Sequence, residues 1–492
     1  MTAVLFLVAF GILGWGFYRA QPMGQIGILA WLQSVVLMGP WLLLFGLLSL
    51  GITLNLAVTL LMIVLSISAY ILLGNRLRQL GNQHSIPIPP PQASDTIPPA
   101  TSTSAETPNS LDPKAEAPPT TLSMPSEDLQ AVQGLFGIDT FFVTETIPYQ
   151  DGAIFQGNLR GAAEIVQEQL TQSLNTLLPH QYRLFLVNNA EDKPLVIVLP
   201  TRNDPKTASG FQKLFALILA LATVVSCVIT GGFLQSFNLI DAPQRWREAL
   251  PLGLGLVGIL VAHELGHYVV ARHYQVKLSW PFAFPALQIG SFGVFNRFES
   301  LLPNRQSLFD IALAGPAAGG CLALLSLFIG LGLSPVSQGI ELPTQFLRES
   351  VLVGTLAQLF LGGALQSALI RVHPLVAVGW IGLVITALNL MPAGCLDGGR
   401  IVQAIYGRKI AQRTTWVTLI LLAILSLANP IALYWAIIVL LLQRDLERPS
   451  LNEVTEPNDA RAILGLAALL WMVTILMPLT PSLGNRLGMG SL

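Results

Sequence analysis

Long apolar runs dominate this sequence and decide the class of fold that it can adopt. Of its 492 residues, 52% are hydrophobic and only 11% are charged, whereas charged residues make up about 25% of an ordinary soluble domain. Runs of about 20 apolar residues satisfy their backbone polar groups in lipid as helices. We therefore predict an all-α polytopic membrane protein, a helical bundle, with a small α+β soluble domain inserted in the chain. The formal net charge of −1 leaves no basic excess that would point to nucleic acid.

The apolar runs fall into two blocks. The first block, residues 1–80, is predicted to contain three spans, at 2–18, 26–46 and 51–73. The second block, residues 206–492, is predicted to contain spans at 211–234, 249–271, 308–332, 374–392 and 462–479, and two short apolar runs at 414–428 and 431–443. The stretch 351–370 is also apolar. A crossing there would put the basic residues after Arg400 on the wrong side of the membrane, so we interpret it as a re-entrant or surface segment.

Two polar stretches separate the blocks. Residues 81–125 are rich in Pro, Ser and Thr and are predicted to be an extended linker. Residues 126–205 are regular enough to fold, with strand-like alternation at 139–147 and further strands near 153–158, 182–188 and 194–199. Apolar residues at helical spacing predict a helix over 162–178. We interpret this region as a small α+β domain on the cytoplasmic side, with a regulatory or adaptor role.

The strongest chemical signal is His263-Glu264-Leu-Gly-His267, within the span 249–271. Histidines four residues apart lie on one face of a helix, and neutral imidazoles are good ligands for zinc. Glu264 lies next to that face, where it can deprotonate the attacking water and later protonate the leaving amine. Because ionisable groups inside a span are costly and usually functional, we favour a zinc site over two structural histidines and a snorkelling glutamate.

A catalytic zinc needs a third protein ligand. Asp310 and Asp397 are the candidate carboxylates flanked by apolar residues, and we favour Asp397. It follows the span 374–392, which runs towards the cytoplasm, so it reaches the membrane from the same side as the histidines. Its alternative role is a helix N-cap before Gly398 and Gly399. Cys395, two residues earlier, is a second candidate ligand that we interpret as a small apolar residue.

The segment 278–300 is too short and too rich in Pro to span the membrane. Its residues alternate around Gly290 and Gly293, like a strand or hairpin that dips into the membrane. Such an edge can bind an unwound substrate as an added strand, which makes both glycines candidate substrate-binding residues. The alternative is an interfacial loop anchored by aromatic side chains, and the sequence favours neither.

Three motifs taken together resemble the site-2 protease family of intramembrane zinc metalloproteases. They are His263-Glu264-x-x-His267, Asn389-x-x-Pro392 and Leu396-Asp397-Gly398. The segment from Phe309 to Pro316 matches the stretch that opens the family's next core span. Gly157-Asn-Leu-Arg-Gly161 and the region 136–142 resemble the branch that includes the chloroplast EGY proteins and their cyanobacterial relatives. The resemblance covers residues 130 to 480.

The resemblance implies that His263, His267 and Asp397 bind Zn²⁺ and that Glu264 is the general base. It also implies that Asn389 helps to hold substrate or to stabilise charge. The family cleaves transmembrane protein substrates within the lipid bilayer, often after an earlier cut by a site-1-type protease. The expected location is a cyanobacterial-type plasma or thylakoid membrane, or a chloroplast membrane. Many relatives carry a PDZ domain, which we do not see here, so residues 126–205 are a candidate substrate filter.

The same residues are also compatible with two other functions. A metal-ion carrier could use the same ligands for transit, although the lone Glu264 and the turn after Asp397 suit hydrolysis better. A catalytically inactive membrane scaffold could act through residues 126–205, and it would contain less than one zinc ion per chain.

Overall fold

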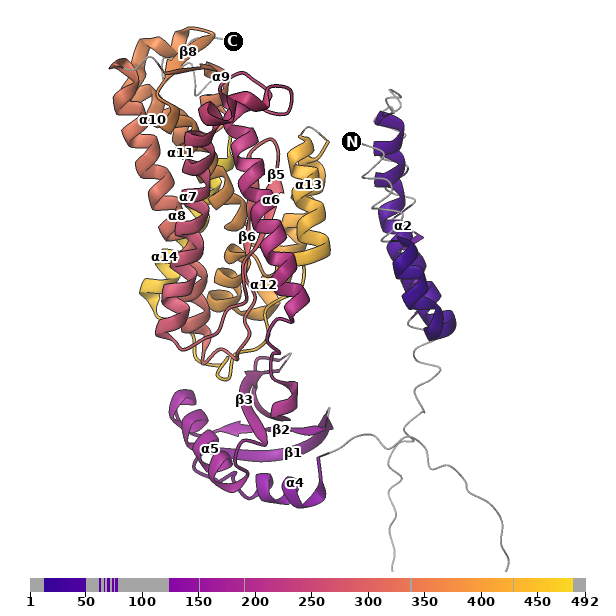
Figure 1. Cartoon of the computed structure of the whole chain (residues 1–492). Coiled ribbons are helices and arrows are strands. Elements are labelled where there is room, and N and C mark those ends of the chain that lie inside the picture. The colour runs from indigo at the N-terminus through magenta and orange to yellow at the C-terminus, as the bar shows by residue number, and fades with distance from the viewer. Residues whose placement is uncertain are drawn as a thin grey trace, which may run out of the picture. The chain divides into compact units, whose positions relative to one another are not determined.

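The structure is a computed structural model that describes residues 13–49, scattered positions between 62 and 77, and residues 124–149, 151–189, 191–336, 339–427 and 429–480. The chain divides into two compact units, residues 1–114 and 115–492. In the first unit, η1 (Gln21–Met23) leads into α2 (Gly24–Ser49), which contains the predicted span 26–46 (Figure 1). The predicted spans 2–18 and 51–73 and the linker 81–125 lie largely outside the described residues.

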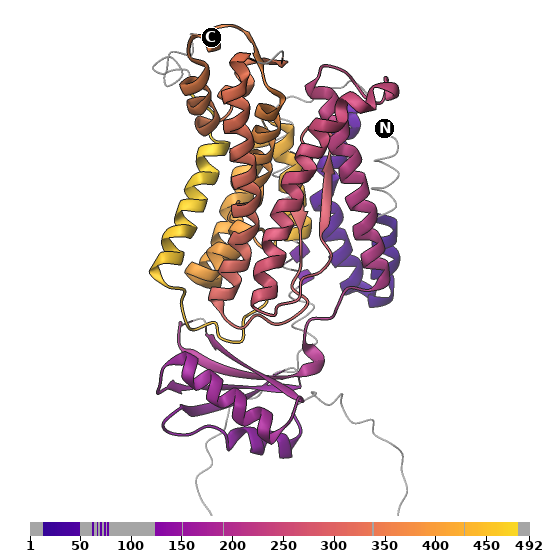
Figure 2. The ribbon, with the colours of Figure 1, turned by 60° about the vertical axis from the view of Figure 1, so that its left-hand side comes forward.

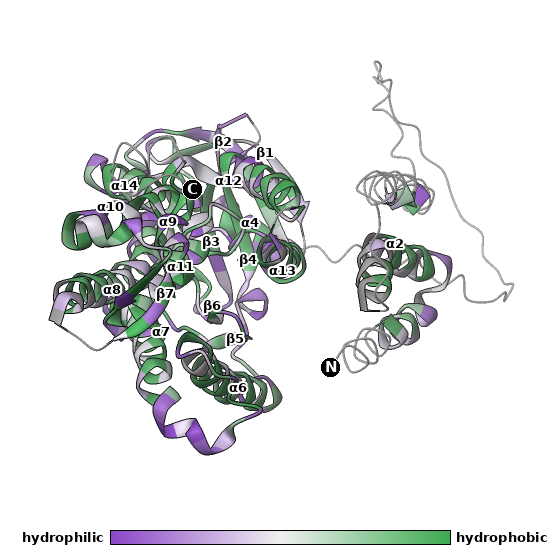
Figure 3. Cartoon of the chain, turned by 90° about the horizontal axis from the view of Figure 1, so that it is seen from above, coloured by the Kyte–Doolittle hydropathy of each residue, from purple (hydrophilic) through white to green (hydrophobic). Residues whose placement is uncertain are grey.

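In the described part of the second unit, four helices are long and apolar enough to cross a bilayer. They are α6 (Gly210–Leu234), α7 (Trp246–His273, after the short turn η3, Pro243–Arg245), α8 (Arg305–Leu333) and α14 (Asp459–Leu476). These helices correspond to four of the predicted spans. Capping boxes at Ser209 and Asn304 satisfy free backbone N–H groups at the starts of α6 and α8. Figure 3 shows these helices as predominantly hydrophobic.

Helix α11 (Pro374–Asn389) lies at the centre of this packing and matches the predicted span 374–392. Nearly all of its residues are buried, because α7, α8 and α14 all contact it. Its apolar character all round the helix is typical of a helix with no exposed face. Gly379 allows the close approach to α8, since a Cβ there would lie 2.7 Å from the carbonyl oxygen of Ala323.

The apolar stretch 351–370 does not form one long helix. Helix α10 (Val351–Leu361) has 11 residues and is followed by η5 (Gly362–Gln366). At about 1.5 Å per residue, such a helix is roughly half as long as the hydrocarbon core is thick. The chain then returns as β8 (Leu369–Val372), which pairs antiparallel with β7 (Ile340–Pro343), and α9 (Thr344–Arg348) lies between β7 and α10. These short elements agree with a segment that does not cross.

The predicted run 414–428 lies largely in the part of α12 (Asp397–Leu425) that follows Gly407. At Gly407 φ is 79° and ψ is 175°, a kink that separates this part from residues 397–406, so α12 consists of two helices. The first of these, which begins at Asp397, was not predicted as a helix. Helix α13 (Pro430–Ile438) and the short π-helix η6 (Val439–Gln443) form the predicted run 431–443.

The segment 278–300 forms a hairpin of β5 (Phe282–Ala286) and β6 (Gly290–Phe295). The strands pair antiparallel, and all six residues of β6 are buried. Figure 1 shows the hairpin lying among the helices. The prediction of a hairpin is confirmed.

The four strands and the helix predicted within residues 126–205 are all present. A sheet of order β1-β2-β4-β3 consists of β1 (Phe141–Tyr149), β2 (Gly152–Leu159), β3 (Tyr182–Asn188) and β4 (Pro194–Pro200). Helix α5 (Ala163–Leu177) lies along the sheet (Figure 2). Its residues Val166, Leu170 and Leu174 are buried in the domain's apolar core. Helix α4 (Ser126–Gln133) was not predicted. The short 3₁₀ helix η2 (Thr201–Asn203) ends the domain.

The α+β domain is joined to the segment that follows η6. The backbone N–H of Leu186 on β3 donates to the carbonyl of Leu451 at 2.8 Å, and the N–H of Glu453 donates to the carbonyl of Leu186 at 2.9 Å. This segment thus extends the sheet beyond β3 and connects it to the helices.

Candidate active site

Two histidines and an aspartate from distant parts of the sequence meet among the helices. His263 and His267 lie on α7, and Asp397 is the first residue of α12. Nε2 of His263 lies 3.1 Å from Oδ2 of Asp397 and 3.1 Å from Nε2 of His267. Nε2 of His267 lies 3.4 Å from Oδ1 of Asp397. All three side chains are buried, and one ligand atom from each lies within 4.8 Å of the others.

A hydrogen bond behind His267 sets the orientation of its ring. Nδ1–H donates to the backbone carbonyl of Ile311 on α8 at 2.7 Å. A ring that donates from Nδ1 presents the lone pair of Nε2, which is the tautomer that a metal ligand requires. Two imidazole nitrogens and a carboxylate are also a known ligand set for catalytic zinc, which keeps a further position for water. The residues present therefore fit a Zn²⁺ ion.

Glycines bring α7 and α8 close enough to form this site. A Cβ at Gly315 on α8 would collide with the imidazole of His267. A Cβ at Gly319, one turn further on, would lie 2.9 Å from the Cβ of His263. Small residues let two helix backbones approach closely, so α8 supplies the wall against which both rings are placed.

We expect Gly315→Ala to lower the affinity for zinc by at least about 10-fold, as does the loss of groups that orient metal ligands. The added methyl group would displace the ring of His267 from the position that faces Asp397. Zinc content per chain after dialysis against a graded series of chelator concentrations measures the effect. Gly332→Ala, on the same helix, is the matched control, because a Cβ at Gly332 meets no atom within 4 Å. Equal zinc retention by the two variants would contradict this account of the helix contact.

The turn between α11 and α12 directs Asp397 towards the histidines. Gly394 adopts a φ of 47°, and a Cβ at Gly398 would collide with the carbonyl of Leu390. Leu396 occupies the N-cap position of α12, where no side chain caps the helix. The carboxylate of Asp397 lies against the imidazoles instead, so the alternative role as an N-cap does not describe this residue.

Cys395 is not part of the ligand group among the described residues. Its Sγ donates to the backbone carbonyl of Asp445 at 3.0 Å. This geometry agrees with its interpretation as a small side chain rather than a soft ligand.

Glu264 lies on α7 between the two histidines in sequence, and its two carboxylate oxygens have different surroundings. Oε2 accepts a hydrogen bond from Nδ2 of Asn296 at 3.3 Å. Oε1 is buried and has no hydrogen-bond partner among the described residues. Glu264 also lines a pocket of about 420 Å³ whose other walls are mostly apolar side chains of α6, α7 and the β5–β6 hairpin. One oxygen is therefore held in place, and the other is left for a small polar molecule.

A buried network behind Glu264 was missed by the sequence analysis. Nη1 of Arg400 donates to Oδ1 of Asn296 at 2.9 Å, and Nη2 donates to Oε1 of Glu447 at 2.6 Å. Nη1 also lies 3.8 Å from Oδ1 of Asp397. A buried arginine needs a compensating carboxylate, so Arg400 itself indicated that an acidic partner lies nearby. The sequence could not show which carboxylate, because Glu447 lies 47 residues from Arg400.

The candidate substrate-binding residues lie where the hairpin packs against the helices. Gly293 has a φ of 121°, and a Cβ there would collide with the side chain of Asn389. Gly290 has a φ of 84° and packs against Cys227. The structure thus brings Gly293 and Asn389 together. The hairpin residues that line the pocket beside Glu264 are neighbours of these glycines, including Ala283, Val294 and Asn296.

Comparison with known proteins identifies two family matches. Residues 252–428 match peptidase family M50, and residues 130–205 match the EGY3 middle domain. Together these matches cover the α+β domain and the helices that carry the candidate site. No solved structure shows significant similarity to this chain.

Several plant proteins are similar to this chain. "Probable zinc metalloprotease EGY2, chloroplastic" of Arabidopsis thaliana is 36% identical over 372 residues, which cover 73% of this chain and 66% of the relative. "Probable zinc metalloprotease EGY1, chloroplastic" of the same plant is 35% identical over 393 residues, which cover 72% of each. "Probable zinc metallopeptidase EGY3, chloroplastic" is 31% identical over 366 residues, covering 69% of this chain and 63% of the relative. The chain thus spans slightly less than two thirds of the EGY2 relative.

Proposed function

Because the chain belongs to the EGY-like members of peptidase family M50, we propose that it is a membrane-embedded zinc endopeptidase. It hydrolyses peptide bonds of transmembrane protein substrates, the reaction of regulated intramembrane proteolysis. The observation that carries this proposal is the grouping of His263, His267 and Asp397, with ligand atoms within 4.8 Å of one another and Glu264 beside an apolar pocket.

In this proposal, His263, His267 and Asp397 hold the metal, and Glu264 moves the protons. A bound Zn²⁺ ion supplies a Lewis acid that polarises the substrate carbonyl and makes a water molecule more acidic. Oε1 of Glu264 accepts the proton of the attacking water and later returns it to the leaving amine. The hydrogen bond from Asn296 holds Oε2, so that the unpaired oxygen performs this task.

We further propose a polytopic helical bundle that presents the site to one side of a lipid bilayer. The four long apolar helices support this placement, as does the exposure of large aliphatic side chains such as Ile463 and Leu470 on α14. The α+β domain then lies on the side from which water reaches the site. The chloroplastic relatives and the branch of the family favour a chloroplast membrane, or a plasma or thylakoid membrane of a cyanobacterial-type cell.

The pocket beside Glu264 suits an apolar substrate segment that arrives from the lipid. Val261, Leu265 and Tyr268 on α7 line it and are more than half exposed. Thr223 on α6 also lines it, and the buried Oγ1 of Thr223 has no hydrogen-bond partner among the described residues. A helical peptide bond must be unwound before attack, and the β5–β6 hairpin offers an edge for an extended strand. Gly290, Gly293 and Asn389 support this role by setting the position of the hairpin.

The α+β domain is proposed to screen substrates on the way to the site. Its strand β3 forms backbone hydrogen bonds with residues 451–453. Glu447, a few residues earlier in the chain, pairs with Arg400 beside Asp397. An earlier cut by a site-1-type protease is part of the same proposal, because it would shorten the substrate enough to pass the domain.

The geometry favours proteolysis over the two alternatives. A metal-ion carrier has no use for a buried carboxylate oxygen that is left unpaired next to an apolar pocket, whereas hydrolysis needs one. An inactive scaffold has no use for a complete ligand set in which the tautomer of His267 is already set by Ile311.

Removal of the metal tests the proposed function. We expect purified protein to release new peptides from a membrane fraction of cells that lack it, as measured by mass spectrometry. Treatment with 1,10-phenanthroline should abolish this release, and one equivalent of Zn²⁺ should restore it, because the residues supply no other Lewis acid. Peptide release that continues in the fully metal-free protein would refute the assignment.

A further inference from the structure

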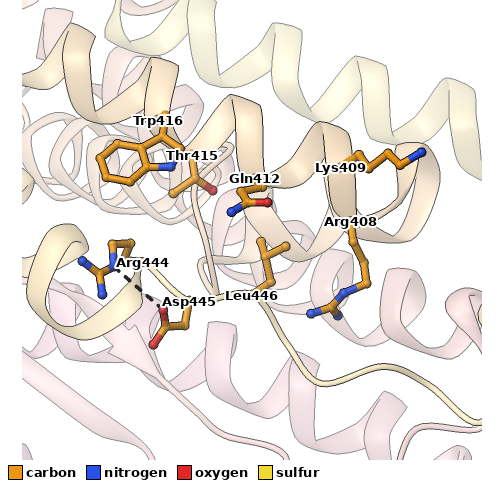
Figure 4. A pocket seen from close by; sticks show the side chains of 8 residues that line it. All are labelled: Arg408, Lys409, Gln412, Thr415, Trp416, Arg444, Asp445 and Leu446. Carbon is orange, nitrogen blue, oxygen red and sulfur yellow. Dashed lines mark ion pairs between the residues drawn. The ribbon is translucent and has the colours of Figure 1, made fainter. Parts of the chain in front are cut away.

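A second pocket lies beside the middle of α12, where Lys409 pairs with Asp192 of the α+β domain. It has a volume of about 450 Å³ and is separate from the pocket beside Glu264. Its walls are the part of α12 that follows Gly407 and the residues directly after η6. Figure 4 shows the side chains that line it, which are Arg408, Lys409, Gln412, Thr415, Trp416, Arg444, Asp445 and Leu446. No residue of the proposed zinc site is among them.

Three cations and one carboxylate line this pocket, which we call the basic pocket. Two of the cations form only exposed ion pairs. Lys409 pairs with Asp192 of the α+β domain at 2.9 Å, and Arg444 lies 3.8 Å from Asp445. The side chains of Asp192 and Asp445 are 73% and 93% exposed, respectively. Exposed ion pairs contribute little to stability, so an anion can replace either carboxylate. Arg408 is different, because it donates to the backbone carbonyl of Glu447 at 2.5 Å and holds the chain in place.

On each wall of the basic pocket, exposed apolar side chains adjoin basic ones in the sequence. On α12, Trp416 and the residues beyond it expose large apolar side chains, among them Val417 and Ile420. On the other wall, Leu441 and Leu442 are more than half exposed and are followed by Arg444. Exposed aliphatic surface that ends in Trp and Arg is typical of the boundary between the hydrocarbon core and the lipid headgroups.

We propose that the basic pocket binds the anionic headgroup of a membrane lipid. The headgroup contacts Arg444 or Lys409 at the rim of the pocket, on whose opposite sides these two cations lie (Figure 4), and the acyl chains follow the exposed apolar surface of α12. Basic pockets between helices at the membrane surface recognise phosphate-bearing headgroups by charge. The adjoining apolar surface identifies a lipid rather than a soluble phosphate as the source of this anion. The inference rests on the proposed placement of α12 in a bilayer, but not on proteolysis.

The bound lipid would stabilise the turn that carries Asp397. The backbone N–H of Gly394 donates to Oγ1 of Thr415 at 2.8 Å, and Thr415 lines the basic pocket. The N–H of Cys395 donates to the carbonyl of Gln443 at 2.9 Å, directly before Arg444. The two walls of the pocket are thus the partners that hold residues 394 and 395 in place. A ligand bound to either wall links lipid composition to the position of a proposed zinc ligand.

Lipid retention tests this proposal without any measurement of cleavage. Wild type and the double variant Lys409→Gln/Arg444→Gln are reconstituted in bilayers of equal parts phosphatidylcholine and phosphatidylglycerol, and native mass spectrometry measures the phosphatidylglycerol retained after release. We expect on the order of 10-fold lower retention by the variant, because each cation near the surface contributes roughly 1 kcal/mol to headgroup attraction. The control double variant Arg371→Gln/Arg413→Gln loses the same charge outside the pocket and should retain the lipid like wild type.

Two outcomes would overturn the proposal. Equal retention by the two double variants would show that the attraction comes from net charge and not from the pocket. A second arm measures the thermal unfolding of wild type in pure phosphatidylcholine with inorganic phosphate. Stabilisation by inorganic phosphate as large as that by phosphatidylglycerol would assign the pocket to a soluble phosphate instead of a lipid.

Discussion

Glu264→Gln should abolish peptide-bond cleavage and leave zinc binding intact. Glutamine has nearly the same size as glutamate, and its side-chain carbonyl can still accept the hydrogen bond from Asn296. It cannot accept a proton from the attacking water, and a positioned general base contributes about 10²- to 10⁴-fold to the rate. The expected result is therefore cleavage lowered by about 10³-fold or more with an unchanged zinc content. Substrate release from membranes and metal analysis of the same preparation measure the two effects.

Glu248→Gln is the matched control for this experiment. Glu248 lies in the first turn of the same helix, where its exposed carboxylate pairs with Arg245 at 2.6 Å. We expect this variant to cleave like wild type, because exposed ion pairs of this kind contribute little to stability. Cleavage by Glu264→Gln at the rate of the control would refute the role of Glu264 as the base. Loss of zinc from Glu264→Gln would instead show that Glu264 supports the metal.

Asp397→Asn should remove both zinc and activity. The substitution keeps the shape of the side chain but removes the negative charge that faces two imidazole rings at 3.1 and 3.4 Å. Loss of a group that hydrogen-bonds to a metal ligand lowers metal affinity by about 10- to 100-fold. Loss of the charge of the ligand itself should therefore lower zinc affinity by more than about 100-fold. Competition with a zinc-binding dye measures the affinity, and the membrane assay measures cleavage.

Asp459→Asn is the control for Asp397→Asn. Asp459 also lies in the first turn of a long helix, but it is exposed and far from the ligand group in sequence. Both variants lose a carboxylate near a helix N-terminus, a change of roughly 0.3 to 1 kcal/mol. Only Asp397→Asn should lose zinc. Full zinc affinity in Asp397→Asn would show that residue 397 is not a ligand, and the proposed site would then lack its third side chain.

Features that depend only on residues close together in the sequence could be predicted from it. The long helices α6, α7 and α8 follow from local hydrophobicity, and the common face of His263 and His267 follows from helical geometry. The strands of the α+β domain were also predicted from local alternation. Of α12, only the apolar run that follows the kink at Gly407 was predicted, and residues 397–406 were not predicted as a helix.

The sequence could suggest that distant residues meet, but it could not show which side chains touch or in what geometry. Asp397 lies 134 residues from His263. The sequence favoured a ligand role for Asp397 over a helix N-cap, but only the turn at Gly394 shows how its carboxylate comes to lie against the rings. The partners Asn296 and Glu447 had no signal of their own, because an asparagine or a glutamate in a loop is ordinary.

Local pattern therefore predicted the long apolar helices of this protein and the helix face that carries His263 and His267. Tertiary packing decided the rest: the position of Asp397 beside the two imidazole rings, the hydrogen bond that holds Glu264, and the glycine at position 315 that makes room for His267. The physical reason is that hydrophobicity and helical periodicity act over a few residues, whereas the approach of α7, α8 and α12 depends on how their whole surfaces fit together.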